Sequence, residues 1–121
     1  MSTKKIIIDD ETEILNMLSR FLNKSGKYSV ATFSNPVVAI DNLKREKYDL
    51  VLLDIMMPQM NGLEALEKIM QINKEQKVIM MTAYSTLDKV LKSHKEGATN
   101  YVMKPFDSLQ ALENKIIEVL K

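Results

Sequence analysis

The sequence predicts a single α/β domain in which helices cover both faces of a parallel β-sheet. Short apolar runs alternate along the chain with longer segments whose apolar residues recur at the helical period of about 3.6. Three of these runs are continuous and rich in isoleucine, valine or leucine, which is typical of strands buried on both faces. A chain of 121 residues has room for one core of ordinary size, so we expect one domain over residues 1–121.

We expect a strand at each of five short apolar runs. Strands inside a parallel sheet have both faces covered, so their sequence is apolar throughout and does not alternate with polar residues. In chain order, the runs are Ile6–Ile8, Tyr28–Phe33, Leu50–Leu53, Val78–Met81 and Tyr101–Met103.

Segments of helical period follow the first three predicted strands. The first carries an apolar stripe over residues 14–22 and ends at Lys24-Ser25-Gly26, because glycine favours the backbone conformation that closes a helix. A shorter second helix is expected after Asn35-Pro36. The third begins at Asn61-Gly62 and carries its apolar residues on one side.

Two further helices complete the pattern. The fourth is expected from about Ser85 to Glu96, with Gly97 as its stop, and the fifth carries Leu109 to Val119 with Asp107 or Ser108 as its N-cap. Five strands that alternate with five helices favour right-handed crossovers and a flavodoxin-like, doubly wound (βα)5 sheet of order 2-1-3-4-5. In such sheets, ligands bind beyond the carboxyl ends of the strands, between the first and the third.

Composition and charge exclude several classes of function. The formal net charge is +1, from 17 basic and 16 acidic residues mixed along the chain, so no basic surface for nucleic acid or for a membrane is expected. The sequence contains no cysteine, which excludes disulfides, thiolate metal sites and a cysteine nucleophile. No apolar run reaches the length of a signal-peptide core or a membrane span, so we expect a cytoplasmic protein.

Polar residues follow the predicted strands at the edge where their carboxyl ends meet. We expect the first strand to end in Asp9-Asp10 and the third in Asp54. Carboxylates gathered at one edge repel one another unless a proton or a cation lies between them, and Mg²⁺ suits such oxygen ligands. Thr82, at the end of the fourth strand, and Lys104, at the end of the fifth, are donors that an anion at Asp54 needs.

Taken singly, these acidic residues have plainer interpretations. Asp9, Asp10 and Glu11 also suit the N-terminus of the following helix, where negative charge is favourable. An aspartate such as Asp54 is common at the start of a loop. The joint occurrence of acids, a hydroxyl and an ammonium group at one edge of the sheet favours a binding site.

Four segments of the sequence together resemble the receiver domains of bacterial two-component response regulators, of the chemotaxis-regulator type. They are IIIDDE at 6–11, LLDIMMPQMNGLEAL at 52–66, VIMMTAYS at 78–85 and EGATNYVMKPF at 96–106. They occur in the order and spacing of that family and span nearly the whole chain. The resemblance implies a switch worked by phosphorylation, with no enzymatic activity beyond phosphotransfer to itself and autodephosphorylation.

The resemblance also implies a phosphoacceptor and a metal site. Asp54 would accept a phosphoryl group from the phosphohistidine of a sensor histidine kinase or a phosphotransfer protein. Asp10 and Asp54 would bind Mg²⁺ directly, and Asp9 would hold it mainly through water. The backbone carbonyl of Met56 would supply a further ligand.

Thr82, Lys104 and Tyr101 are implied to respond to the phosphoryl group. Lys104 would pair with it, and the hydroxyl of Thr82 would bond to it, with backbone N–H groups of Met56 and Ala83 as further donors. As Thr82 moves, Tyr101 would turn inward and reshape the face of the fourth helix, fifth strand and fifth helix. That face would bind a downstream protein, an output domain or a second copy of the chain, and no nucleic acid directly.

Other functions are kept as alternatives. A haloacid-dehalogenase-type phosphohydrolase also has a nucleophilic aspartate after an apolar strand, although such enzymes typically carry a second acid where this chain has Met56. A pseudo-receiver binds partners without phosphorylation, although such modules usually lose the acidic pair, the acceptor or the lysine. A flavodoxin-like electron carrier is disfavoured because the acids after the first strand would repel a flavin phosphate. The end at Lys121 fits a stand-alone protein and an excised domain equally.

Overall fold

The structure is a computed structural model of the chain. It describes residues 3–9, 11–24, 26, 28–55, 57, 60–83, 97, 100–104 and 108–120. The described residues form five strands and four helices. In chain order, these are β1 (Thr3–Ile8), α1 (Thr12–Asn23), β2 (Tyr28–Phe33), α2 (Pro36–Arg45), β3 (Leu50–Asp54), α3 (Gly62–Ile72), β4 (Val78–Ala83), β5 (Asn100–Lys104) and α5 (Leu109–Leu120).

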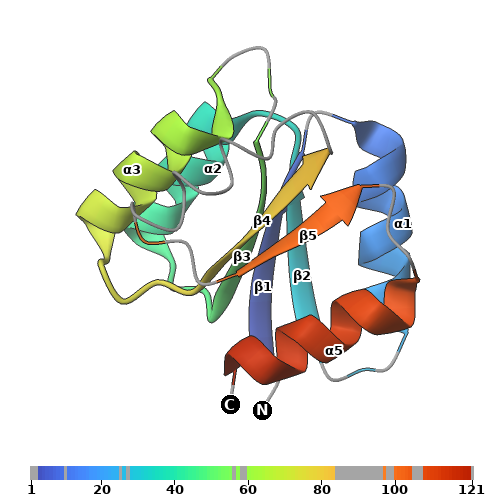
Figure 1. Cartoon of the computed structure of the whole chain (residues 1–121). Helices are drawn as coiled ribbons and strands as arrows, with labels where there is room; N and C mark the ends of the chain where they lie inside the picture. Colours follow the sequence, from blue (N-terminus) through green and yellow to red (C-terminus); the bar gives the residue numbers. More distant parts are fainter. Residues whose placement is uncertain are drawn as a thin grey trace.

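The sheet confirms the predicted architecture. Its five strands are all parallel and lie in the order β2-β1-β3-β4-β5, so β3 is central and β2 and β5 are the edges. Helices α2 and α3 cover one face, and α1 and α5 cover the other (Figure 1). The fourth helix expected near 85–96 lies outside the residues that the structure describes.

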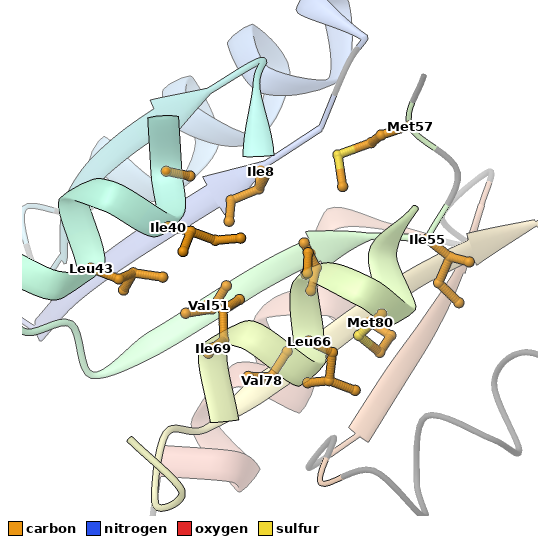
Figure 2. Packing of buried hydrophobic residues seen from close by; sticks show 13 residues of the cluster. Ile8, Ile40, Leu43, Val51, Ile55, Met57, Leu66, Ile69, Val78 and Met80 are labelled. Carbon is orange, nitrogen blue, oxygen red and sulfur yellow. The ribbon is translucent and has the colours of Figure 1, made fainter. Parts of the chain in front are cut away.

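Alternate residues of the central strand divide the core into two clusters. Val51 and Leu53 face α2 and α3, whereas Leu50 and Leu52 face α1 and α5. Every residue of β3 is buried, which explains its uninterrupted apolar run. Figure 2 shows the first cluster, in which side chains of two helices pack on three strands: Ile40 and Leu43 of α2, Leu66 and Ile69 of α3, with Ile8, Val51, Val78 and Met80.

Side-chain caps fix where three of the helices begin. The side chain of Asn35 accepts a hydrogen bond from the N–H of Val37 at 2.9 Å, with Pro36 in the first turn of α2. The side chain of Asn61 accepts from the N–H of Glu64 at 3.0 Å at the start of α3. The hydroxyl of Ser108 accepts from the N–H of Ala111 at 3.0 Å, which makes Ser108 the N-cap of α5.

Some strands are longer than their apolar runs. β1 begins at Thr3 and not at Ile6, because its polar first residues pair through their backbone with Tyr28–Val30 of β2. β4 continues through Ala83, and β5 spans Asn100–Lys104. Thr82 is therefore the last residue but one of β4, and Lys104 is the last residue of β5, at the strand ends where they were expected. Within the described part of the chain, no helix is long and apolar enough to cross a membrane.

Candidate functional site

The strand register brings the two acids of β1 and β3 to adjacent positions. Ile8 pairs with Leu53, so the next residues along, Asp9 and Asp54, lie at the same level on neighbouring chains. Neighbouring strands are about 4.8 Å apart, so the two carboxylates start one strand spacing from each other. Both side chains leave the sheet on the same side, because Ile8 and Leu53 share the opposite one.

Asp9 is held in place at the end of β1. Its N–H donates to the carbonyl of Phe33 at 3.2 Å, which carries the β1–β2 pairing one residue further. Its carboxylate oxygen Oδ1 accepts from the N–H of Glu11 at 2.9 Å, a turn in which an aspartate bonds the backbone two residues on. The side chain is fully buried, so this carboxylate is a fixed feature of the interior.

Side-chain capping bonds do not account for the acidic segment as far as the structure describes it. The residue at the N-cap position of α1 is Glu11, whose side chain makes no capping hydrogen bond and is exposed. The carboxylate of Asp9 bonds the N–H of Glu11 itself and not one inside the first turn. The side-chain bond of a simple N-cap is thus absent at Glu11, while the negative charge of Asp9 and Glu11 at this helix start stays compatible with the plainer interpretation.

Asp54 ends β3 with only 4% of its surface exposed. Asp9, Asp54 and Gln76 are the buried polar side chains among the described residues, and the two acids lie at the same edge. Two carboxylates one strand apart repel each other when both are ionised. A cation bound between them would relieve that repulsion.

The segment after Asp54 folds back tightly over the end of β3. The N–H of Ile55 donates to the carbonyl of Met81 at 3.1 Å, and the N–H of Gly62 donates to the carbonyl of Ile55 at 2.6 Å. Ile55 and Met57 are both buried in the first cluster. The start of α3 thus lies directly against the backbone of the candidate phosphoacceptor.

Gly62 makes this close approach possible. A Cβ atom at this position would lie 2.5 Å from the Cα of Ile55 and closer still to the carbonyl oxygen of Asp54. Both are backbone atoms, so no side chain fits unless the end of β3 moves. From the sequence, Asn61-Gly62 indicated only the start of a helix, and nothing in it signalled this contact.

The structure brings together part of the predicted site. Asp9 and Asp54 meet as expected, and the backbones of Thr82 and Lys104 lie at the same edge of the sheet. The side chains of Thr82 and Lys104, and the whole of Asp10 and Met56, lie outside the described residues. No group of three or more acidic, histidine or cysteine side chains that could hold a metal occurs among the residues described.

Tyr101 lies on the edge strand β5, half-buried against the first cluster. Its N–H donates to the side-chain oxygen Oδ1 of Asn100 at 2.8 Å. Its carbonyl accepts from the ammonium Nζ of Lys115, in α5, at 2.6 Å, and the same Nζ lies 4.8 Å from the centre of the Tyr101 ring. Sequence patterns did not identify Lys115.

Comparisons with known proteins agree with this arrangement. The chain is similar to the sporulation initiation phosphotransferase F of Bacillus subtilis, with 39% identity over 107 residues, or 88% of this chain and 86% of that protein. It is 32% identical over 118 residues to the chemotaxis protein CheY of Thermotoga maritima, covering 96% and 98% of the two chains. A CheY-like receiver domain protein of Methanospirillum hungatei JF-1 has a similar crystal structure, with a TM-score of 0.89, 31% identity and 98% and 94% coverage.

The family comparison extends over almost the whole chain. Residues 6–117 match the model of the response regulator receiver domain. This span includes all four segments on which the resemblance was based, together with every strand end that forms the candidate site. The chain therefore belongs to the response regulator receiver domain family of two-component systems.

Proposed function

We propose that this domain is a signalling switch that accepts a phosphoryl group on Asp54 from the phosphohistidine of a sensor histidine kinase or a phosphotransfer protein. The observation that carries the proposal is the burial of Asp54 beside Asp9, at the carboxyl edge of a receiver-family sheet. Switching by phosphorylation is what membership of the family implies. The choice of Asp54 as acceptor, the metal and the partner are our proposals.

The reaction is an in-line displacement at phosphorus. A carboxylate oxygen of Asp54 forms a bond to phosphorus as the P–N bond to the donor histidine breaks, and the imidazole takes a proton as it leaves. Phosphoryl transfer depends on alignment and on neutralising the equatorial oxygens more than on covalent chemistry. The close contact of Gly62 with the backbone of Asp54 and Ile55 would restrict movement of the acceptor and so favour alignment.

The residues at this edge suit a magnesium ion. Asp9, Asp10, Asp54 and the carbonyl of Met56 would offer only oxygen atoms, the ligands that hard divalent cations prefer. Asp9 is buried and oriented by its bond from the N–H of Glu11, which suits a carboxylate that would hold a metal-bound water. When bound, Mg²⁺ would neutralise negative charge on the phosphoryl oxygens.

Two residues beyond the level of the acceptor are proposed to sense the added group. Asp54 pairs with Met81 of β4, and Met81 pairs with Val102 of β5. Thr82 is the residue after Met81, and Lys104 is the second residue after Val102. The phosphoryl group adds about −1.5 to −2 charge and three strong acceptor oxygens. The hydroxyl of Thr82 and the ammonium of Lys104 are the donors assigned to it.

The energy of these bonds is sufficient for a switch. Moving a minor state from about 1% to 99% requires roughly 5.5 kcal/mol of differential stabilisation. Charge-assisted hydrogen bonds contribute about 1.5–3 kcal/mol each, so two or three of them meet that requirement. Inward rotation of Tyr101 would then change the surface of β5 and α5 for a downstream protein, an output domain or a second copy. Neither the phosphohydrolase nor the pseudo-receiver is favoured by the family match.

The proposal is tested by incubation with acetyl phosphate and MgCl₂, followed by intact-mass measurement. We expect the wild type to gain one acid-labile phosphoryl group, and neither Asp54→Asn nor protein treated with EDTA to gain any. Asp49→Asn is the matched control, because Asp49 is an exposed aspartate just before the same strand. Unchanged labelling of Asp54→Asn would overturn the assignment.

A further inference from the structure

Lys115 connects two sides of the sheet that are otherwise separate. Helix α5 packs on the second cluster through Leu112, Ile116 and Val119, on the face that also receives Val102 of β5. Tyr101 packs against the first cluster, on the opposite face. Since β5 is an edge strand, a long side chain from α5 can pass around its open side. Lys115 does this and contacts Tyr101.

The contact has two parts with different consequences. The ammonium of Lys115 donates to the carbonyl of Tyr101 at 2.6 Å, and the N–H of Tyr101 is bonded by Asn100, so side chains satisfy both backbone groups at the open edge of the strand. The same ammonium lies 4.8 Å from the centre of the tyrosine ring, within the range of a cation–π interaction. The first part holds the backbone, and the second holds the ring.

Of these two parts, the contact with the ring is the one that a turn of the side chain would change. The backbone of Tyr101 is held in the β4–β5 pairing, so the bond to its carbonyl can persist when the ring turns. The ring is half-buried beneath the ammonium, and an inward rotation toward Thr82 would take it away from that charge. A contact shifts the equilibrium between two states only by the difference between its interaction free energies in those states.

We propose that Lys115 is a positioning residue of the switch, which holds Tyr101 in its resting, half-exposed orientation. This inference rests on the proposed function, since it takes the inward rotation of Tyr101 as the response to phosphorylation. Lys115 thereby opposes activation and sets how much phosphorylation is needed to turn the ring. Removal of its charge should raise the ratio of active to resting protein about two- to fivefold, the effect of one partly exposed cation–π contact.

A simpler role for Lys115 is to close the edge of β5. If this were its whole role, removal of the ammonium would lower stability and leave the ring of Tyr101 where it is. Lys115→Met removes the charge and the donor and keeps most of the side-chain length. Lys115→Arg keeps a charge that can bond the carbonyl and stack on the ring. Lys68→Met is the matched control for loss of an exposed lysine on another helix, α3.

Fluorine NMR of protein labelled with 3-fluorotyrosine reads the ring directly. The chain has four tyrosines, and Tyr101→Phe assigns the signal of interest. The wild type with and without acetyl phosphate and MgCl₂ gives the resting and phosphorylated positions of that signal. Without phosphorylation, we expect the signal of Lys115→Met to lie closer to the phosphorylated position than the wild-type signal does. The size of this movement is the one that an about two- to fivefold higher ratio of active to resting protein produces. Lys115→Arg and Lys68→Met should coincide with the wild type.

The outcomes separate this inference from the proposed function. A Tyr101 signal in Lys115→Met that coincides with the wild type overturns the inference, whether or not urea denaturation finds the variant less stable. A wild type that is phosphorylated on Asp54 without movement of the Tyr101 signal also overturns it, and leaves the phosphoacceptor intact. If the proposed function itself is wrong, intact-mass measurement will find no phosphoryl group that depends on Asp54.

Discussion

The edge of the sheet at which its parallel strands begin (the amino edge) and the edge at which they end (the carboxyl edge) contain different kinds of buried polar group. At the amino edge, before β4, the amide Nε2 of Gln76 donates to the carbonyls of Tyr48 and Lys77 at 3.1 and 3.2 Å. The hydroxyl of Tyr48 donates to Asn42 at 2.6 Å. At the carboxyl edge, the buried groups are the carboxylates of Asp9 and Asp54. A neutral amide hydrogen-bonded to the backbone lies at one edge, whereas the other holds two buried acidic side chains whose ionised forms would repel each other and suit a cation.

The amino edge is also kept neutral by its tyrosines. Burial raises the pKa of Tyr28, and the charge of Glu113 and its hydrogen bond raise it further. Burial likewise raises the pKa of Tyr48, with smaller contributions from the charge and hydrogen bond of Glu46. The raised pKa moves ionisation of both phenols to more alkaline pH, and at neutral pH they are protonated as any phenol is. Changes at this edge should alter stability alone, and changes at the other should alter phosphorylation.

The largest effect is expected from Gly62→Ala, at the carboxyl edge. The new Cβ would overlap the backbone of Asp54 and Ile55, so we expect a loss of about 3 kcal/mol in the free energy of unfolding and much slower phosphoryl uptake. Gly26→Ala is the control, because Gly26 has φ +71° and nothing within 4 Å of a built Cβ. It should lose about 1 kcal/mol and keep normal uptake. Equal phosphoryl uptake by Gly62→Ala and the wild type would contradict the proposed contact.

Gln76→Leu should affect only the amino edge. The substitution removes the buried donor to the carbonyls of Tyr48 and Lys77, of which that of Lys77 also accepts from the N–H of Val51, and we expect a loss of about 2 kcal/mol by urea denaturation. Uptake of the phosphoryl group should equal that of the wild type. Gln71→Leu, at an exposed position of α3, controls for the change of residue type. A slower uptake in Gln76→Leu alone would show that the two edges are not independent.

A smaller effect is expected from magnesium, and only at the carboxyl edge. Mg²⁺ at about ten times its Kd should raise the free energy of unfolding by about 1.4 kcal/mol. Asp9→Asn keeps an oxygen for the N–H of Glu11 and loses the charge, so Mg²⁺ should raise its free energy of unfolding by less. Gln76→Leu should gain as much as the wild type, and NaCl of equal ionic strength controls for screening. An equal gain in Asp9→Asn would remove Asp9 from the metal site.

The smallest effect is expected from Tyr28→Phe. Because folding raises the pKa of Tyr28 above its ordinary value of 10.0, the stability that it contributes is complete below about pH 10 and is lost as pH rises through the folded-state pKa. The difference in unfolding free energy between the wild type and Tyr28→Phe should therefore shrink at alkaline pH. Urea denaturation of both proteins from pH 7 to about pH 10.5 measures it. A difference that stays constant with pH would contradict the stated cause.

Most of the fold could be predicted from the sequence, because burial on both faces leaves a clear pattern. β3 is apolar from Leu50 to Leu53, and its neighbours follow at spacings that suit parallel crossovers. The polar start of β1 could not be predicted, since Thr3–Lys5 pair through backbone groups that every residue has. The sequence left Asp107 and Ser108 open as the N-cap of α5, because both residue types cap helices. The hydrogen bond from the N–H of Ala111 assigns this role to Ser108.

The candidate site was predictable in part for a related reason. Parallel strands end at one edge, so the meeting of Asp9 and Asp54 follows from the topology. The burial of Asp9 and its bond from Glu11 do not, because the same acidic residues also suit a helix cap. The roles of Gly62 and Lys115 depend on the path of a turn and on which helical residue reaches around β5. No local pattern encodes either.

The central claim is that Asp54 carries the phosphoryl group, and locating the modified residue tests it most directly. Borohydride reduces an aspartyl phosphate to homoserine, so the wild type is treated with acetyl phosphate and MgCl₂, reduced and digested with trypsin. The peptide of residues 48–68 contains both Asp49 and Asp54. We predict homoserine at position 54 with Asp49 unchanged. Homoserine at position 49 or in another peptide, with Asp54 intact, would contradict the account.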